Sequence, residues 1–314
     1  MKRNKTKQLR GVIMLMAATM IWGTSFVFQS RGNELTGPLT FNLLRCLTAA
    51  VSTGLMLKIH SDHTVLKKDN SVIAGIISGT MTFFMTALLQ LGMAMGTSVG
   101  KAGFLVSTTV IIVPVLSVLA GRKQSAKTWA AVAVAAAGMY LLCSTDSSGF
   151  AVSDLLILLS ALASALQILA LNHYRDSIRS VRVSFLQFLT AAILSLISVI
   201  LFERPVSMGS FVLAALQPAV ILAVLYAGVL ASGLAYNLQI ESQKVLDPAA
   251  VSVLLCFESV FSALAGFIFL HELLSVRELS GCALIFLAAV LSQLPAEKLL
   301  ARFHGSHRMQ MKAR

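Results

Sequence analysis

Long apolar runs separated by short polar segments dominate the chain. The clearest run is residues 248–270, whose only charged side chain is Glu258. At about 1.5 Å per residue, a helix of this length covers about 34 Å, enough to cross the hydrocarbon core of a membrane. Asp247 and Pro248 suit the first turn of such a helix. The pattern therefore predicts a membrane-spanning helix with one carboxylate near the bilayer midplane.

Ten apolar runs of this kind occur along the 314 residues. They are residues 11–30, 38–57, 72–95, 99–121, 128–143, 155–172, 183–202, 211–238, 248–270 and 279–294. The fifth and tenth are short, and only GTSVGK separates the third from the fourth. The predicted fold class is an all-α integral membrane protein with ten transmembrane helices.

The composition agrees with a multi-pass membrane protein. Hydrophobic residues make up 57% of the chain and charged residues only 12%, about half the charged share of a soluble domain. The four cysteines all lie inside apolar runs and form no CxxC pair, and the six histidines have no ligand spacing. We therefore interpret the cysteines as small packing residues, not as disulfide partners or metal ligands, and we expect no metal or cofactor.

The basic residues are distributed unevenly between the loops. The formal net charge of +12 would indicate nucleic-acid binding in a soluble protein. If the amino terminus is cytoplasmic, 20 of the 25 Lys and Arg lie on the cytoplasmic side and four on the other, with Arg45 inside a span. This asymmetry predicts that both termini face the cytoplasm of a multi-pass cell-membrane protein, which is the cytoplasmic membrane in a bacterium. No nucleic-acid partner is expected.

Short matches recur along the chain with a nearly constant offset. LTAA at residues 47–50 recurs at 189–192, and Leu89-Gln90 recurs as Leu238-Gln239. We divide the chain into a basic tail (1–10), two five-helix repeats (11–146 and 147–294) and a second basic tail (295–314). Because five helices is an odd number, the second repeat must enter the membrane inverted, as in many secondary transporters.

Four motifs occur in order along these runs. They are IWGTSF at 21–26, GPLTFN at 37–42 followed by Arg45, TSVGKAGF at 97–104 followed by Val113-Pro114, and FESVF at 257–261 followed by His271-Glu272. Together they resemble the EamA family of the drug/metabolite transporter superfamily over about residues 11–294. Two departures are Arg122-Lys123, where a Gly-Glu-Arg turn is usual, and Ser259-Val260, where the family often has a proline.

The resemblance implies a fold, a cavity and a substrate class. The fold is two inverted five-helix repeats, and the cavity is lined mainly by the first, third, fourth, sixth, eighth and ninth helices. Members carry amino acids, metabolites or drugs, most often outward. The implied partners are a small-molecule substrate and the lipid bilayer. A second copy of the chain, in a homodimer, is a further possible partner.

One face of the first helix combines aromatic and polar side chains. Trp22, Ser25, Phe26 and Gln29 recur at helical spacing. This face can line a cavity, because the Gln29 amide cannot face lipid unsatisfied. Alternatively it is an aromatic packing face, with Ser25 bonded to its own helix backbone.

Further cavity candidates are polar residues within the other spans. They are Gln90 and its repeat mate Gln239, Gln167, Tyr226, Tyr236 and Asn237, together with Thr108, the repeat mate of Glu258. The alternative for the amides and phenols is interhelical hydrogen bonding that only holds the bundle.

Three charged residues within or near spans need separate interpretation. Arg45 either snorkels to the interface or binds an anionic substrate group, and Lys101 either snorkels or guards the entrance with its charge. Glu258 lies near the midplane, where an ionisable group is costly and usually functional, so it is a candidate for substrate binding and for ion coupling. The alternative is a neutral acid bonded to a Ser or Thr.

These features predict a secondary transporter, most simply an exporter that works by alternating access. The alternatives are a membrane sensor or scaffold without flux and an intramembrane enzyme. Enzyme chemistry needs several convergent acids, His or Cys, whereas this chain offers one central carboxylate. We therefore expect no catalytic residues.

Overall fold

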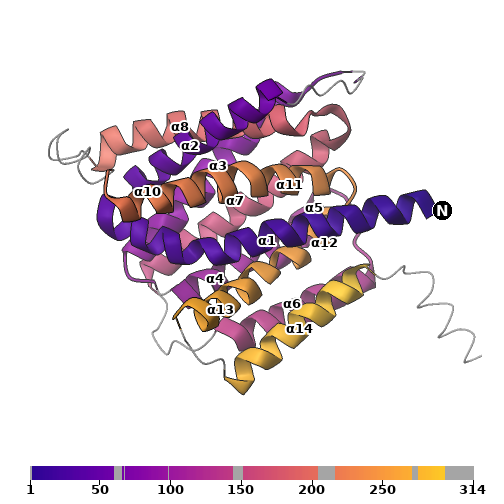
Figure 1. Cartoon of the computed structure of the whole chain (residues 1–314). Coiled ribbons are helices and arrows are strands. Elements are labelled where there is room, and N and C mark those ends of the chain that lie inside the picture. Colours follow the sequence, from indigo (N-terminus) through magenta and orange to yellow (C-terminus); the bar gives the residue numbers. More distant parts are fainter. Residues whose placement is uncertain are drawn as a thin grey trace, which may run out of the picture.

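The chain is built from helices that pack side by side, as the computed structural model shows (Figure 1). The structure describes residues 2–59, 66, 68–97, 99–143, 151–203, 216–270 and 275–293. Within these residues the regular elements are α-, 3₁₀- and π-helices, without a β-strand. The all-helical prediction is confirmed.

The helices follow one another with short connections. The first repeat contains α1 (Lys2–Thr36), α2 (Pro38–Ile59), α3 (Ser71–Ala94), α4 (Val99–Ser107), α5 (Thr109–Leu119) and α6 (Ala126–Cys143). The second contains α7 (Val152–Tyr174), η1 (Arg175–Ser177), α8 (Ser180–Ser198), η2 (Val199–Glu203), α10 (Pro218–Leu225), η3 (Tyr226–Leu234), α11 (Ala235–Gln243), α12 (Pro248–Leu255), α13 (Phe257–Leu270) and α14 (Val276–Gln293). Helix α1 already begins at Lys2, inside the segment 1–10 that was predicted to be a basic tail.

Six helical stretches of the described chain are long and apolar enough to cross a membrane. They are Pro38–Ile59, Ser71–Ala94, Val152–Ser177, Ser180–Glu203, Pro218–Gln243 and Pro248–Ala265. Shorter apolar helices cover Leu105–Leu119, Ala126–Leu141 and Leu279–Ser292. These lengths indicate a multi-pass membrane protein. The number of ten spans and the orientation of the termini stay predictions.

Two spans are interrupted near their centres, where the sequence analysis predicts continuous helices. The run 99–121 divides at Thr108 into α4 and α5, and the run 248–270 divides at Cys256 into α12 and α13. At both places the backbone N–H bonds three residues back, Thr108 to Leu105 and Cys256 to Val253, so the helix tightens for one turn. The break points are 148 residues apart, close to the repeat offset, so the interruption belongs to both repeats.

Glycines let helices approach closely at two places that shape the centre. A Cβ added to Gly23 of α1 would lie 2.6 Å from the carbonyl oxygen of Glu258 on α13. A Cβ added to Gly228 of η3 would lie 2.6 Å from the Cβ of Thr48 on α2. These contacts hold α1 against α13 and α2 against η3. Helices α6 and α14 pack together at the edge of the bundle (Figure 1).

The segment before α3 and the segment between α7 and α8 are joined by a set of polar contacts that we call the Asp69 clasp. It comprises Asp69, Asn70, Ser71, Ser177, Arg179 and Arg182. The backbone N–H of Asn70 donates to the carbonyl oxygen of Ser177 at 2.8 Å, and the backbone N–H of Arg179 donates to Ser71 Oγ at 2.9 Å. Arg182 Nη1 donates to Asp69 Oδ2 at 2.8 Å. The clasp ties the first repeat to the second.

The carboxylate of Asp69 is electrostatically stabilised by the clasp. Burial alone raises the pKa of Asp69, but hydrogen bonds from Ser71 and the charges of Arg182 and Arg179 outweigh it. The pKa of Asp69 therefore lies below its ordinary value.

Candidate functional site

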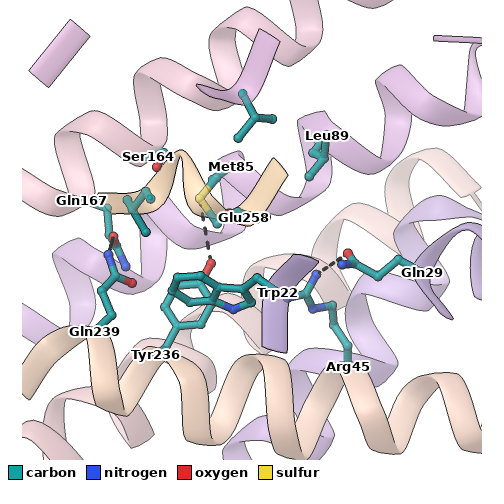
Figure 2. Close-up of a pocket in the computed structure, with 12 residues that line it drawn as sticks. Trp22, Gln29, Arg45, Met85, Leu89, Ser164, Gln167, Tyr236, Gln239 and Glu258 are labelled. Carbon is teal, nitrogen blue, oxygen red and sulfur yellow. Dashed lines mark hydrogen bonds between the residues drawn. The ribbon is translucent and has the colours of Figure 1, made fainter. Parts of the chain in front are cut away.

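A cavity of about 70 Å³ with both apolar and polar walls lies between the two repeats. It is lined by Trp22, Gln29, Arg45, Met85, Leu89, Val106, Ser164, Gln167, Tyr236, Gln239, Leu255 and Glu258. These residues come from α1, α2, α3 and α4 of the first repeat and from α7, α11, α12 and α13 of the second. Figure 2 shows Arg45 and Gln29 at one end, Gln167 and Gln239 at the other, and Trp22, Tyr236 and Glu258 between them.

The Arg45 end, formed by Gln29, Arg45, Gln90 and Ser232, is densely hydrogen-bonded. Arg45 is only 4% exposed, so it does not snorkel to the interface. Its Nη1 donates to Gln29 Oε1 at 2.9 Å, and its Nε and Nη2 donate to Ser232 Oγ at 3.2 and 3.0 Å. The same side-chain oxygen, Gln29 Oε1, also accepts from Gln90 Nε2 at 2.9 Å. One buried oxygen thus ties α1, α2 and α3 together.

The same network continues along α1. Gln90 Oε1 accepts from Asn33 Nδ2, and Gln29 Nε2 donates to Ser25 Oγ at 2.7 Å. The Ser25 hydroxyl in turn donates to the carbonyl oxygen of Trp22 at 2.7 Å. Ser25 therefore orients Gln29 from behind and does not line the cavity.

The Gln239 end, formed by Gln167 and Gln239, is connected more weakly. Gln239 Nε2 donates to Gln167 Oε1 at 3.4 Å, close to the limit of a hydrogen bond. Within the described chain, Gln167 Nε2 and Gln239 Oε1 have no partner although both are buried. One unused donor and one unused acceptor therefore remain at this end.

Aromatic rings form the middle of the cavity. The Trp22 and Tyr236 rings meet edge to face with their centroids 4.9 Å apart. The indole N–H of Trp22 donates to the carbonyl oxygen of Ala231 at 2.6 Å, which fixes the ring against η3. The Tyr236 hydroxyl points to Met85 Sδ at 3.9 Å, a weak acceptor (Figure 2). This wall is mainly apolar with one hydroxyl at its edge.

Glu258 lies two residues after the break at Cys256, at the start of α13. Its carboxylate lines the cavity and forms no hydrogen bond or ion pair within the described part of the chain. The charge of Arg45 acts on it across the cavity. The neighbouring Ser259 hydroxyl lies 3.3 Å from that of Ser107, so the two breaks meet beside the carboxylate.

The structure brings about half of the predicted site residues together and places the others elsewhere. The cavity is lined by Trp22, Gln29, Arg45, Gln167, Tyr236, Gln239 and Glu258. Ser25 and Gln90 lie directly behind it. The Tyr226 hydroxyl contacts Thr24 and its ring stacks on Phe28, while Thr108 bonds to the carbonyl oxygen of Leu105. Asn237 is buried outside the lining, and the side chain of Lys101 lies outside the described residues.

Several lining residues were not among the sequence-based site candidates. Met85, Leu89, Val106, Ser164 and Leu255 are apolar or small, and nothing in a hydrophobic run distinguishes a cavity-facing from a lipid-facing member of this kind. Gln239, in contrast, was a candidate as the repeat mate of Gln90, and it lines the cavity.

A second, larger cavity of about 620 Å³ lies at the ends of α5, α7 and α14 and the beginnings of α6 and α12. Its walls carry Arg122, Lys123, Lys127 and Arg175 together with Asp176 and Asp247. Asn172 of this cavity follows Gln167 along α7, so the cavity lies at the same end of the bundle as the Gln239 end.

Comparisons with known proteins agree with this architecture. The model of the EamA-like transporter family matches residues 9–144 and again residues 151–294. A solved structure described only as "Crystal structure of protein" superposes with a TM-score of 0.73 at 21% sequence identity, covering 92% of this chain and 98% of its own. The search of curated proteins found no match.

Proposed function

Since the chain belongs to the EamA-like transporter family, we propose that it is a secondary exporter of small metabolites, amino acids or drug-like compounds that works by alternating access. The family is one of membrane transporters, not of enzymes, and its members need a small-molecule substrate and a lipid bilayer. Export, the substrate range and alternating access are the proposed parts.

The observation that carries the proposal is the cavity between the two repeats, which encloses Arg45 and Glu258. Four helices from each repeat contribute to its lining, so a movement of one repeat against the other changes every wall. A carrier needs this arrangement, because a site shared by two halves can be exposed to either side in turn. A scaffold has no need to enclose Arg45 and Glu258 in a cavity, where buried charge is costly.

The proposed orientation places the Gln239 end toward the cytoplasm. The basic residues of the second cavity and the Asp69 clasp lie at that end, as the positive-inside rule requires. Cysteine labelling in a chain whose native cysteines are replaced by alanine tests this. Met95→Cys should react with a membrane-impermeant reagent from outside, and Lys123→Cys should not. The reverse pattern would invert the orientation.

Transport is tested with a plug in the cavity. Ser164 lines the cavity on α7, whereas Leu159 of the same helix is 44% exposed. Ser164→Trp should fill the cavity and stop flux, while Leu159→Trp should face lipid and keep it. Metabolite profiles of cells overproducing each variant, inside against outside, identify what moves.

The outcomes separate a carrier from a scaffold. A carrier changes the metabolite profile in the wild type and in Leu159→Trp, but not in Ser164→Trp. Purified wild-type protein in liposomes should move the same compound without ATP. If no compound moves in cells or liposomes, the sensor or scaffold becomes the better interpretation.

A further inference from the structure

We propose that the cavity binds a small zwitterion, with its anionic group on the Arg45 guanidinium and its cationic group on the Glu258 carboxylate. This inference rests on the proposed transport function and specifies the substrate class of the same cavity. It follows from two opposite charges that line one small cavity while neither is neutralised by the described chain.

Arg45 is prepared to receive an anion. Its hydrogen bonds go only to neutral oxygens of Gln29 and Ser232, and no acid within the described residues forms an ion pair with it. A guanidinium has five N–H donors, and three are used, so two remain. The planar fork matches a carboxylate or a similar anion in a bidentate manner. The bonds to Ser232 and Gln29 fix the orientation of that fork before a ligand arrives.

Glu258 is the complementary group. It lies on α13 of the other repeat, within the electrostatic range of Arg45 but not in an ion pair with it. A carboxylate without a protein donor at this depth is stabilised by a ligand cation. An ammonium group supplies both the charge and the N–H donors.

The walls between the two charges fit a compact ligand. Trp22 and Tyr236 offer aromatic surface, and Met85 and Leu255 offer apolar surface. An ammonium beside the Trp22 ring gains a cation–π contact in addition to the carboxylate. At about 70 Å³ the cavity has room for about five water molecules, so a ligand that joins both charges must be small.

The arrangement also gives the ligand a direction. The anionic group lies at the Arg45 end, and the cationic group lies toward the middle, on the second repeat. Arg45 belongs to the first repeat and Glu258 to the second, so the ligand bridges the two moving halves.

The experiment matches variants of the protein to variants of the ligand. The probes are L-alanine, L-leucine, β-alanine and 4-aminobutyrate, each compared with its methyl ester, which is only cationic, and its N-acetyl form, which is only anionic. Binding to the purified full chain in detergent is measured by calorimetry. We expect the wild type to bind at least one zwitterion at least tenfold more tightly than both of its single-charge forms.

The two variants should then fail in opposite ways. Arg45→Gln should lose the preference for the zwitterion over the ester, and Glu258→Gln should lose the preference over the N-acetyl form. Arg45→Lys and Glu258→Asp keep the charges and should retain a preference, which guards against a folding defect in the neutral variants. Leu159→Ala, which changes an exposed side chain of α7 outside the lining, should leave the order of the three forms unchanged.

Three results would overturn the zwitterion assignment. One is a wild type that binds none of the zwitterions. Another is equal affinity for a zwitterion and its single-charge forms. The third is a pair of neutral variants that lose all three forms equally. The transport proposal survives these results if Ser164→Trp still abolishes the flux of another compound, and it fails separately if no compound moves.

Discussion

At the Arg45 end of the cavity, Gln90 on α3 donates to Gln29 on α1; at the other end, its repeat mate Gln239 on α11 donates to Gln167 on α7. Both repeats thus join their third helix to their first by a pair of glutamines. The first pair is 2.9 Å apart and is reinforced by Arg45 and Asn33, while the second is 3.4 Å apart and leaves two buried polar atoms unpaired within the described chain.

The difference shows where the structure separates most easily. Opening the Arg45 end requires breaking several buried hydrogen bonds. Three of them are donated by the charged Arg45 guanidinium, and bonds to charged groups are the stronger kind. Opening the Gln239 end breaks one long bond inside the cavity and, outside it, the partly exposed contacts of the Asp69 clasp. In the proposed orientation the easily opened end faces the cytoplasm, where an exporter takes up its substrate.

The largest effect is expected from Gly23, which lies on α1 between the two ends. In Gly23→Ala, the new Cβ would lie 2.6 Å from the carbonyl oxygen of Glu258, so α1 and α13 must move apart. We expect the free energy of unfolding in detergent to fall by about 2 kcal/mol or more. Gly103→Ala is the control, because its Cβ would meet only Ser259 Oγ at 3.7 Å. Equal stability of the two variants would contradict the close contact.

Gln90→Leu should have the next largest effect, because it breaks the Arg45 end. The substitution removes the acceptor of Asn33 and one donor to Gln29, and Gln90 is fully buried. We expect a loss of about 1–2 kcal/mol in the free energy of unfolding. Gln90→Glu tests the same position with similar shape, and it should keep the bond from Asn33. If Gln90→Leu leaves the free energy of unfolding unchanged, the network does not stabilise the protein.

Asp69→Asn addresses what holds the Gln239 end together from outside the cavity. Arg182 loses its charged partner, and since the pair is partly exposed the expected loss is at most about 1 kcal/mol. The pKa of Asp69 is lowered in the folded protein, so its contribution is fully present above the unfolded pKa of about 4 and is lost as the pH falls through the folded value. Thermal unfolding should therefore separate the wild type from Asp69→Asn at pH 7 but not at pH 2.

Gln239→Leu should have the smallest effect and gives the direct comparison with Gln90→Leu. It removes one long hydrogen bond and a buried oxygen that has no partner within the described residues. We expect a change in the free energy of unfolding of at most about 0.6 kcal/mol, in either direction. If Gln239→Leu destabilises as much as Gln90→Leu, the two ends are held equally and the proposed order of opening is wrong.

The candidate site was only partly predictable from the sequence. Gln29 and Glu258 stand out because an amide or a carboxylate inside an apolar run is energetically costly in the membrane and is usually functional. Tyr226 and Asn237 carry the same signal, yet Tyr226 packs against Thr24 and Phe28 and Asn237 lies outside the lining. A polar residue in a span must avoid lipid, but it can do so against a neighbouring helix as well as in a cavity.

The helix breaks were also beyond the sequence pattern. Thr108 lies in the short polar stretch 107–109 and Cys256 in an apolar stretch before Glu258, and neither break residue is a glycine or a proline. The breaks arise where the two repeats meet, as the contact between Ser107 and Ser259 indicates. A contact between residues about 150 positions apart leaves no trace in a local pattern.

The sequence by itself determined the helical class, the membrane character and the family, because these follow from long apolar runs and ordered motifs that are local along the chain. Only the tertiary structure decided that Arg45 and Glu258 face one cavity, that Ser25 stands behind Gln29, and that the two glutamine pairs differ in strength. The reason is physical. In a membrane, lipid and protein interior are both apolar, so hydropathy selects a helix without selecting its inward face. That choice is made when the helices pack.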